Sequence, residues 1–213
     1  MKTKDRIVAT ALSLFNEAGY SAVTTAALAE RLGISEGNLW YHFKTKRALL
    51  DAIGERFAAS ITARLALVPE GDPVASYARL LRTMMAEFRD FRFLYRDQPA
   101  YGDHAAVIAE HAAGWTRQTF TQIEAHLGAL VEAGLLGLPR ERLADLAINA
   151  TILLRFGLEH ERELGIPTAS GTGAVHRTLL RHLTLFEHAL APAALARLMA
   201  AIKAIEAEAP LAA

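Results

Sequence analysis

The sequence predicts an all-α fold, and three observations support this prediction. Of the 213 residues, 52% are hydrophobic and only 8% are aromatic, and alanine and leucine, both good helix formers, dominate. Apolar side chains recur every three or four residues along most of the chain, which is the spacing of one helix face. Glycine and proline fall between these periodic segments, where they end helices.

Two short helices joined by a tight turn are expected near the N-terminus. Thr24 precedes an apolar run and is placed to cap the first helix, because its hydroxyl can accept from an unpaired backbone N–H. Gly33 ends that helix, since glycine takes a left-handed backbone without a steric penalty. Ser35 caps the second helix, residues 36–43. This is a helix-turn-helix, whose second helix is suited to a DNA major groove.

The second helix divides into an inner and an outer face. Leu39 and Phe43, four residues apart, are expected in the core. The remaining side chains point outward, although their types are unusual for a solvated surface: Glu36, Gly37, Asn38, Tyr41 and His42. A third helix starts beside a capping threonine and three cations, which suit a DNA phosphate: Thr45, with Lys44, Lys46 and Arg47.

The motif has a recognisable pattern: Thr-Thr at 24–25, Leu-Ala-Glu-Arg-Leu-Gly-Ile-Ser at 28–35, and Leu-Trp-Tyr-His-Phe-Lys-Thr-Lys-Arg-Ala-Leu-Leu at 39–50. In this pattern the chain resembles the DNA-binding domain of the tetracycline-repressor (TetR) family of bacterial regulators. The resemblance implies base reading at positions 36–38 and a phosphate contact by Lys46. The predicted DNA-binding residues are Thr24, Thr25, Ser35, Glu36, Gly37, Asn38, Trp40, Tyr41, His42, Lys44 and Lys46.

The rest of the chain is also expected to be helical. A scaffold helix covers residues 4–18, and the third helix runs over 46–67. Further helices are expected over 74–95, 103–113, 115–133, 140–164, 175–190 and 192–207. We predict a three-helix DNA-binding domain at 1–50 and a larger helical ligand-binding and dimerisation domain at 51–213. Net charge is zero, but residues 1–50 carry +3 and the remainder −3, which concentrates phosphate affinity at one end.

Several classes of protein are disfavoured by the sequence. The absence of cysteine excludes disulfides and thiolate zinc sites, and it suits a cytoplasmic location. No signal peptide or membrane span is expected. The eight histidines lack the three- or four-residue spacing of helical metal sites, so no metal is predicted. No catalytic residues or cofactor are predicted either, and the chain is not expected to be an enzyme.

An apolar stripe in the body could line a ligand cavity. Its members are Tyr77, Met84, Met85 and Phe88, to which Trp115 and Phe120 are added. Core packing explains each residue taken singly, whereas methionines and aromatics together suit an adaptable ligand wall. The resemblance implies an apolar effector pocket in this body, with His111, Arg117 and Arg155 as candidate polar contacts.

The resemblance further implies a homodimer formed by helices near the C-terminal end, residues 140–164 and 175–190. Leu179, Leu183 and Phe186 form an apolar stripe there, although one body alone could bury it. The predicted function is a DNA-binding transcriptional regulator, a repressor released from a palindromic double-stranded DNA operator by a small apolar or amphipathic ligand. In the alternative, the helical body is a protein-interaction module without a small-molecule effector.

Overall fold

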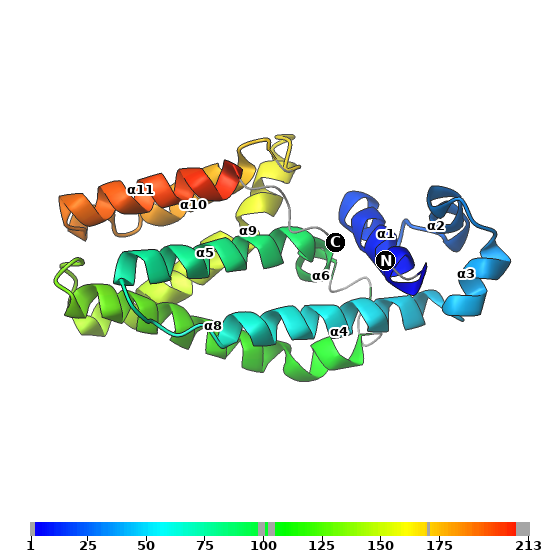
Figure 1. Cartoon of the computed structure of the whole chain (residues 1–213), viewed down its shortest axis with the longest axis horizontal. Helices are drawn as coiled ribbons and strands as arrows, with labels where there is room; N and C mark the ends of the chain where they lie inside the picture. The colour runs from blue at the N-terminus through cyan, green and yellow to red at the C-terminus, as the bar shows by residue number, and fades with distance from the viewer. Residues whose placement is uncertain (1–2, 98–100, 102–104, 170, 208–213) are drawn as a thin grey trace. The chain divides into compact units, whose positions relative to one another are not determined.

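Helices make up the fold throughout (Figure 1), as the sequence predicts. The computed structural model describes residues 3–97, 101, 105–169 and 171–207. The α-helices are α1 (Thr3–Ala18), α2 (Thr25–Leu32), α3 (Glu36–His42), α4 (Lys46–Leu65), α5 (Pro73–Asp90), α6 (Arg92–Arg96), α8 (Ala106–Glu132), α9 (Leu143–Glu163), α10 (Ala174–Leu183) and α11 (Pro192–Ala207). Two 3₁₀ helices are η2 (Arg140–Arg142) and η3 (Glu187–Ala189). In these residues no strand forms, and Leu136 and Leu190 make one isolated antiparallel bridge.

The residues cluster into two compact units. Unit 1 consists of Met1–Ile61 and Arg89–Ala113, and unit 2 consists of Thr62–Phe88 and Gly114–Ala212. Unit 1 therefore contains the helix-turn-helix together with a later segment of the chain, which is held to it by long-range contacts. The domain boundary after residue 50 stays a prediction.

The core of unit 1 forms around α1. Ile7, Ala11 and Phe15 are fully buried, as expected for one face of an amphipathic helix. The ring of Phe15 lies 5.2 Å from those of both Tyr20 and Phe93. Offset and edge-on aromatic pairs of this kind add specificity to apolar burial. They tie the segment after α5 to the N-terminal helices.

The helix predicted over residues 74–95 is broken at Phe91 into α5 and α6, so that part of the prediction is wrong. The cause is Asn16 on α1. Its Nδ2 donates to the carbonyl of Asp90 (2.8 Å), and its Oδ1 accepts from the backbone N–H of Phe93 (3.0 Å). A side chain from α1 thus pairs backbone groups that the break leaves without a helical partner.

The two helices predicted over 103–113 and 115–133 form a single helix, α8, from residue 106 onward. Residues 103 and 104, with which the first was expected to begin, lie outside the described residues. Gly114 does not interrupt the helix, because an isolated glycine costs only about 1 kcal/mol relative to alanine. Packing along so long a helix outweighs that cost.

In unit 2 the buried face of α5 contacts α8 and α10: the ring of Tyr77 lies 6.5 Å from that of His126, and its hydroxyl lies 2.7 Å from His182 Nε2. Tyr77, Leu80 and Met84 are fully buried on α5. The helices α9 and α10 approach closely at Gly157, where an added Cβ would lie 2.5 Å from Cγ2 of Thr178. Glycine at this position is therefore required by the packing of the two helices.

Two predicted segments near the C-terminus differ from the structure. Residues 140–142 form η2, and the α-helix starts only at Leu143. The segment predicted over 175–190 ends its α-helix at Leu183 and continues into turns and η3.

Candidate nucleic-acid interface and ligand site

The helix-turn-helix has the capping geometry that its sequence predicts. The N–H of Ala27 donates to Thr24 Oγ1 (3.1 Å), and the N–H of Asn38 donates to Ser35 Oγ (3.2 Å). Gly33 has φ +66°, and the N–H of Ile34 reaches back to the carbonyl of Ala29 (3.1 Å). These bonds form a Schellman cap, which fixes the turn between α2 and α3.

The two faces of α3 divide as predicted. Leu39 and Phe43 are buried, at 2% and 5% exposure. Glu36, Gly37 and Asn38 are exposed at the start of the helix, and Tyr41 is 76% exposed. A tyrosine with most of its surface in solvent is unusual for a folded monomer, since its ring is largely apolar. The exposed face thus presents an amide, a carboxylate and an aromatic ring together.

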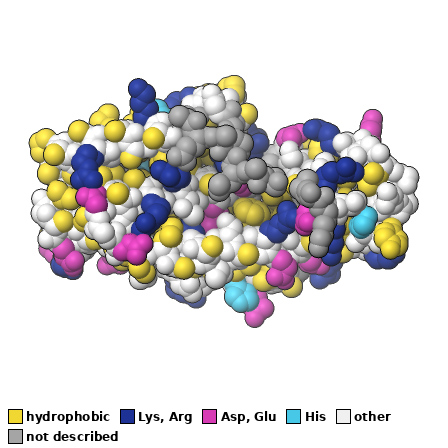
Figure 2. Space-filling view, in the orientation of Figure 1, with side chains coloured by type: hydrophobic (Ala, Val, Ile, Leu, Met, Phe, Trp, Pro, Cys, Tyr) yellow, Lys and Arg dark blue, Asp and Glu magenta, His cyan; other side chains and the backbone are white. Residues whose placement is uncertain are grey.

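Other predicted DNA-binding residues surround this face. Trp40 and His42 are half-buried, and the ring of His42 lies edge-on to that of Tyr41, 5.2 Å away. The hydroxyl of Thr25 donates to Glu36 Oε2 (3.1 Å), which links α2 to the first turn of α3. Lys and Arg side chains are interspersed with Asp and Glu over these helices (Figure 2), in keeping with a small positive excess.

The two predicted phosphate-binding lysines have different surroundings. Lys44 is exposed. Lys46 is half-buried; its ammonium donates to the carbonyl of Tyr20 and lies 4.3 Å from the Tyr20 ring centroid and 5.6 Å from that of Phe15. Burial lowers the pKa of Lys46 below its ordinary value. In this structure Lys46 is engaged within unit 1, so its phosphate contact stays a prediction.

The predicted ligand-pocket residues lie in different surroundings, and their shared role stays a prediction. Tyr77, Met84, Met85 and Phe88 are buried in the core, and the Tyr77 hydroxyl lies 2.7 Å from His182 Nε2. Trp115 and Phe120 are half-buried on α8. His111 is exposed and belongs to unit 1, whereas Arg155 is half-buried in unit 2 with its guanidinium 5.2 Å from the Phe156 ring centroid. Of the nine residues, Arg117 alone lines the pocket found in unit 2.

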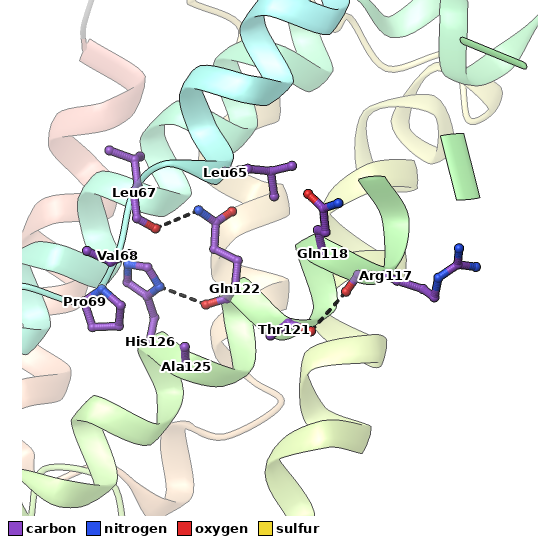
Figure 3. A pocket seen from close by; sticks show the side chains of 10 residues that line it. All are labelled: Leu65, Leu67, Val68, Pro69, Arg117, Gln118, Thr121, Gln122, Ala125 and His126. Atoms are coloured by element: carbon purple, nitrogen blue, oxygen red, sulfur yellow. Dashed lines mark hydrogen bonds between the residues drawn. The ribbon is translucent and has the colours of Figure 1, made fainter. Parts of the chain in front are cut away.

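That pocket has a volume of about 380 Å³ and lies where the end of α4 and the loop after it meet α8 (Figure 3). Its apolar lining residues are Leu65, Leu67, Val68, Pro69 and Ala125, and its polar ones are Arg117, Gln118, Thr121, Gln122 and His126. Gln122 and His126 were not among the predicted site residues. Their signal was a pair of polar residues four apart on the apolar face of α8, beside Ile123 and Leu127.

A buried polar network lies behind this pocket. Arg64 and Glu87 are each 2% exposed, and Arg64 Nε donates to Glu87 Oε2 (2.9 Å). Arg64 also donates to Gln122 Oε1 (2.8 Å) and Thr119 Oγ1 (3.1 Å). Gln122 Nε2 donates to the carbonyls of Arg64 (2.6 Å) and Leu67 (2.8 Å), near the C-terminal end of α4. Because the two charges pair with each other and form further hydrogen bonds, the free-energy cost of burying them is offset.

No group of three or more His, Asp or Glu side chains among the described residues is arranged to hold a metal ion. Within the same part of the chain, every helix is too short or too polar to cross a membrane.

Two family models match the sequence. One, described as bacterial regulatory proteins of the tetR family, covers residues 7–53, and the other, described as a bacterial transcriptional repressor (TetR), covers residues 56–198. The fold and the motif place the chain in the class of helix-turn-helix transcriptional regulators. More narrowly, the chain belongs to the TetR family, as the match over most of its length shows. This is a family of transcriptional regulators, not of enzymes.

Individual relatives are similar mainly in the N-terminal part. Tetracycline repressor protein class C of Escherichia coli is 50% identical over 52 residues, 24% of each chain. The class A repressor from transposon 1721 of Escherichia coli is 38% identical over 91 residues, 43% of this chain and 40% of that protein. The chain thus matches less than half the length of these relatives.

Solved structures are similar over nearly the whole chain. A TetR-family regulator from Marinobacter aquaeolei VT8 has a TM-score of 0.76 at 23% identity, covering 96% of this chain and 99% of that one. CprB from S. coelicolor A3(2) has a TM-score of 0.70 at 17% identity, covering 97% and 98%. A protein described as a gamma-butyrolactone receptor (ArpA like protein) has a TM-score of 0.66 at 18% identity, covering 96% of each. These likenesses establish the shared fold.

Proposed function

We propose that this chain is a repressor that binds a palindromic DNA operator as a homodimer and is released by a small apolar or amphipathic ligand. The observation that carries the DNA-binding part is the exposed face of α3, which presents Glu36, Gly37, Asn38 and Tyr41 from a helix fixed by two caps. A dimer would set two such helices one DNA turn apart, which calls for a palindromic operator. Action on the genome also requires a cytoplasmic location.

Base recognition is assigned to the first turn of α3. The amide of Asn38 can pair with adenine N6 and N7, and the carboxylate of Glu36 can accept from cytosine N4. Selection of bound sequences from random duplexes tests this. Asn38→Ala should relax the preference at one base pair in each half-site, a loss of about 1–3 kcal/mol at that position. The matched control is Gln118→Ala, which removes an exposed amide in unit 2. If Asn38→Ala still selects the wild-type motif at full strength, the assignment is wrong.

The two lysines give a second test of the interface. Exposed Lys44 is free to reach a phosphate, whereas Lys46 must leave its contacts with Tyr20. Lys44→Ala and Lys46→Ala should each weaken binding to all sequences alike and lower the salt slope by about one unit. An unchanged slope in a salt titration removes that lysine from the interface.

We assign dimerisation to α9. Ile148, Ile152 and Phe156 lie four residues apart and are 38%, 52% and 46% exposed, which is a stripe on one face of the helix. The other candidate stripe, Leu179, Leu183 and Phe186, is buried inside unit 2 at 0–2% exposure, so glutamate there would disrupt the core. The expected dimer surface therefore includes this stripe of α9 and excludes Leu179, Leu183 and Phe186.

Sedimentation equilibrium tests this surface. Ile152→Glu should give monomers and reduce operator affinity, because a half-site alone binds weakly. The control is Met199→Glu, which replaces another exposed apolar side chain, on α11, at 48% exposure. Figure 2 shows hydrophobic side chains over that helix. A dimer of unchanged stability in Ile152→Glu would show that another surface pairs the subunits.

Release by a ligand is supported by the pocket of unit 2, whose volume lies in the range of about 300–1,000 Å³ typical of small-molecule sites. A structural neighbour described as a gamma-butyrolactone receptor is consistent with small-molecule sensing. The alternative is a body that binds another protein. A small molecule that lowers operator affinity in a two-component titration favours the first function; release only by a protein partner favours the second.

A further inference from the structure

One histidine in the wall of the unit 2 pocket has an unused hydrogen-bonding position. His126 is 1% exposed, and its Nδ1 lies 2.8 Å from the backbone carbonyl of Gln122. Because a carbonyl can only accept, Nδ1 carries the proton of that bond. Burial lowers the pKa of His126, so the ring is neutral near pH 7. Its Nε2 is then an acceptor, shielded from solvent and without a partner among the described residues.

The other buried polar side chain of the wall has no such unused position. Gln122 uses its amide nitrogen on the carbonyls of Arg64 and Leu67, and its amide oxygen accepts from the Arg64 guanidinium. Gln122 therefore holds the wall in place. A buried acceptor without a donor costs free energy, whereas a donor supplied by a ligand recovers it. His126 Nε2 is thus the point at which a ligand gains most from one polar group.

The remaining walls define the rest of the ligand. Five apolar residues line the pocket, and no carboxylate does. Its one cation, Arg117, is exposed, and its side chain points away from the other lining residues (Figure 3). Val68 is 59% exposed in the loop between α4 and α5, outside any helix. That loop forms one wall near His126 (Figure 3) and can move more easily than α8. A ligand that displaces it gains access to Nε2.

We propose that this pocket is the effector site, and that it selects an uncharged apolar molecule carrying one hydroxyl or N–H group that donates to His126 Nε2. The regulatory role of this pocket rests on the proposed function, whereas ligand binding itself does not. Selection arises because the acceptor is already buried and unpaired in the free protein, so a ligand with the donor recovers that cost and an analogue without it does not.

A matched pair of probes tests the donor requirement. 4-Hexylphenol and 4-hexylanisole share an apolar body, and only the phenol donates a hydrogen bond. Isothermal titration calorimetry on the full chain should show the phenol binding about tenfold more tightly. In His126→Phe that preference should vanish. In His126→Gln the amide oxygen replaces Nε2 as an acceptor, so the preference should remain.

A second variant tests the location independently of the histidine. Ala125 is exposed at the pocket wall, so Ala125→Trp should fill the pocket without disturbing the core and should abolish binding of both probes. Circular dichroism and operator affinity without probe confirm that each variant is folded.

The outcomes separate the pocket from the regulatory function. Equal affinity of wild type for the two probes, no binding of either, or unchanged phenol binding in Ala125→Trp overturns the proposal, as does a tenfold preference retained in His126→Phe. Binding as expected without any effect on operator affinity keeps the pocket and refutes its role in release. Sequence-selective operator binding with no phenol binding refutes the pocket alone.

Discussion

We predict that a buried histidine, His182, makes the stability of unit 2 depend on pH between 7 and 5. His182 on α10 is 0% exposed; its Nε2 lies 2.7 Å from the Tyr77 hydroxyl, and its ring centroid is 5.4 Å from that of Phe186. Burial lowers the pKa of His182 from its ordinary value of 6.5 to about 3. Burial raises the pKa of Tyr77 as well, so that the hydroxyl stays protonated.

The direction of the pH effect follows from these values. Because the folded pKa of His182 is below the unfolded one, the unfolded chain takes up the proton first as the pH falls. The effect is absent above about pH 6.5 and grows until about pH 3. Between pH 7 and pH 5 it should lower the free energy of unfolding by about 2 kcal/mol.

Urea unfolding followed by circular dichroism at pH 7, 6 and 5 measures this loss. The test variant is Tyr77→Phe/His182→Leu, which removes the titrating ring together with its hydroxyl partner, so that no buried polar atom is orphaned. His126, whose pKa burial also lowers, adds a loss in the same direction but is present in both proteins and cancels. His188→Gln, at an exposed position, is the control.

The deciding quantity is the loss of unfolding free energy between pH 7 and pH 5 in wild type and in the double variant. The double variant should lose about 2 kcal/mol less than wild type between pH 7 and pH 5. If both lose the same amount, His182 does not carry the pH dependence and the assumed neutral state of the buried ring is wrong.

Three other changes test the packing and capping described above. Glu87→Gln should lower the free energy of unfolding by about 3–5 kcal/mol, because it leaves the buried Arg64 charge unpaired. Changing Arg64 and Glu87 together to methionine should recover most of that loss, and urea titrations measure both effects. Gly157→Ala should cost about 1–3 kcal/mol through its clash with Thr178, and a second change, Thr178→Ala, should recover part of it; additive losses would show that the residues do not touch. Ser35→Ala should cost about 1 kcal/mol and weaken operator binding, whereas Ser35→Asp should keep the cap, as thermal unfolding and operator titration would show.

The helix-turn-helix was predictable because its determinants are local. The caps of Thr24 and Ser35 and the left-handed Gly33 depend on residues within four positions of each, and the structure confirms them. The all-helical fold was predictable for a similar reason, since its periodicity extends over whole segments. The outward side of α3 followed from the same spacing.

What failed depends on contacts between distant segments. The break between α5 and α6 is stabilised by Asn16, more than seventy residues earlier, and no local pattern near Phe91 reveals it. The ligand-pocket residues, which stay a prediction, depend on such contacts as well. An apolar stripe predicts burial but not whether a helix packs against it, and Met84 proved to lie in the core. A buried polar atom without a hydrogen-bond partner, such as His126 Nε2, can be identified only when its neighbours in the fold are known.

The hydrogen bond from Thr25 to Glu36 couples two helices of the motif, and this has an evolutionary consequence. As long as position 36 carries a carboxylate, the threonine hydroxyl restrains the direction in which that carboxylate points. An exchange at position 36 that removes the acceptor also releases the hydroxyl, which in the proposed DNA complex would be a free donor beside the same groove. We therefore expect the two positions to covary among TetR-family relatives, so that, under the proposed function, a duplicated gene copy would acquire a new operator through paired substitutions.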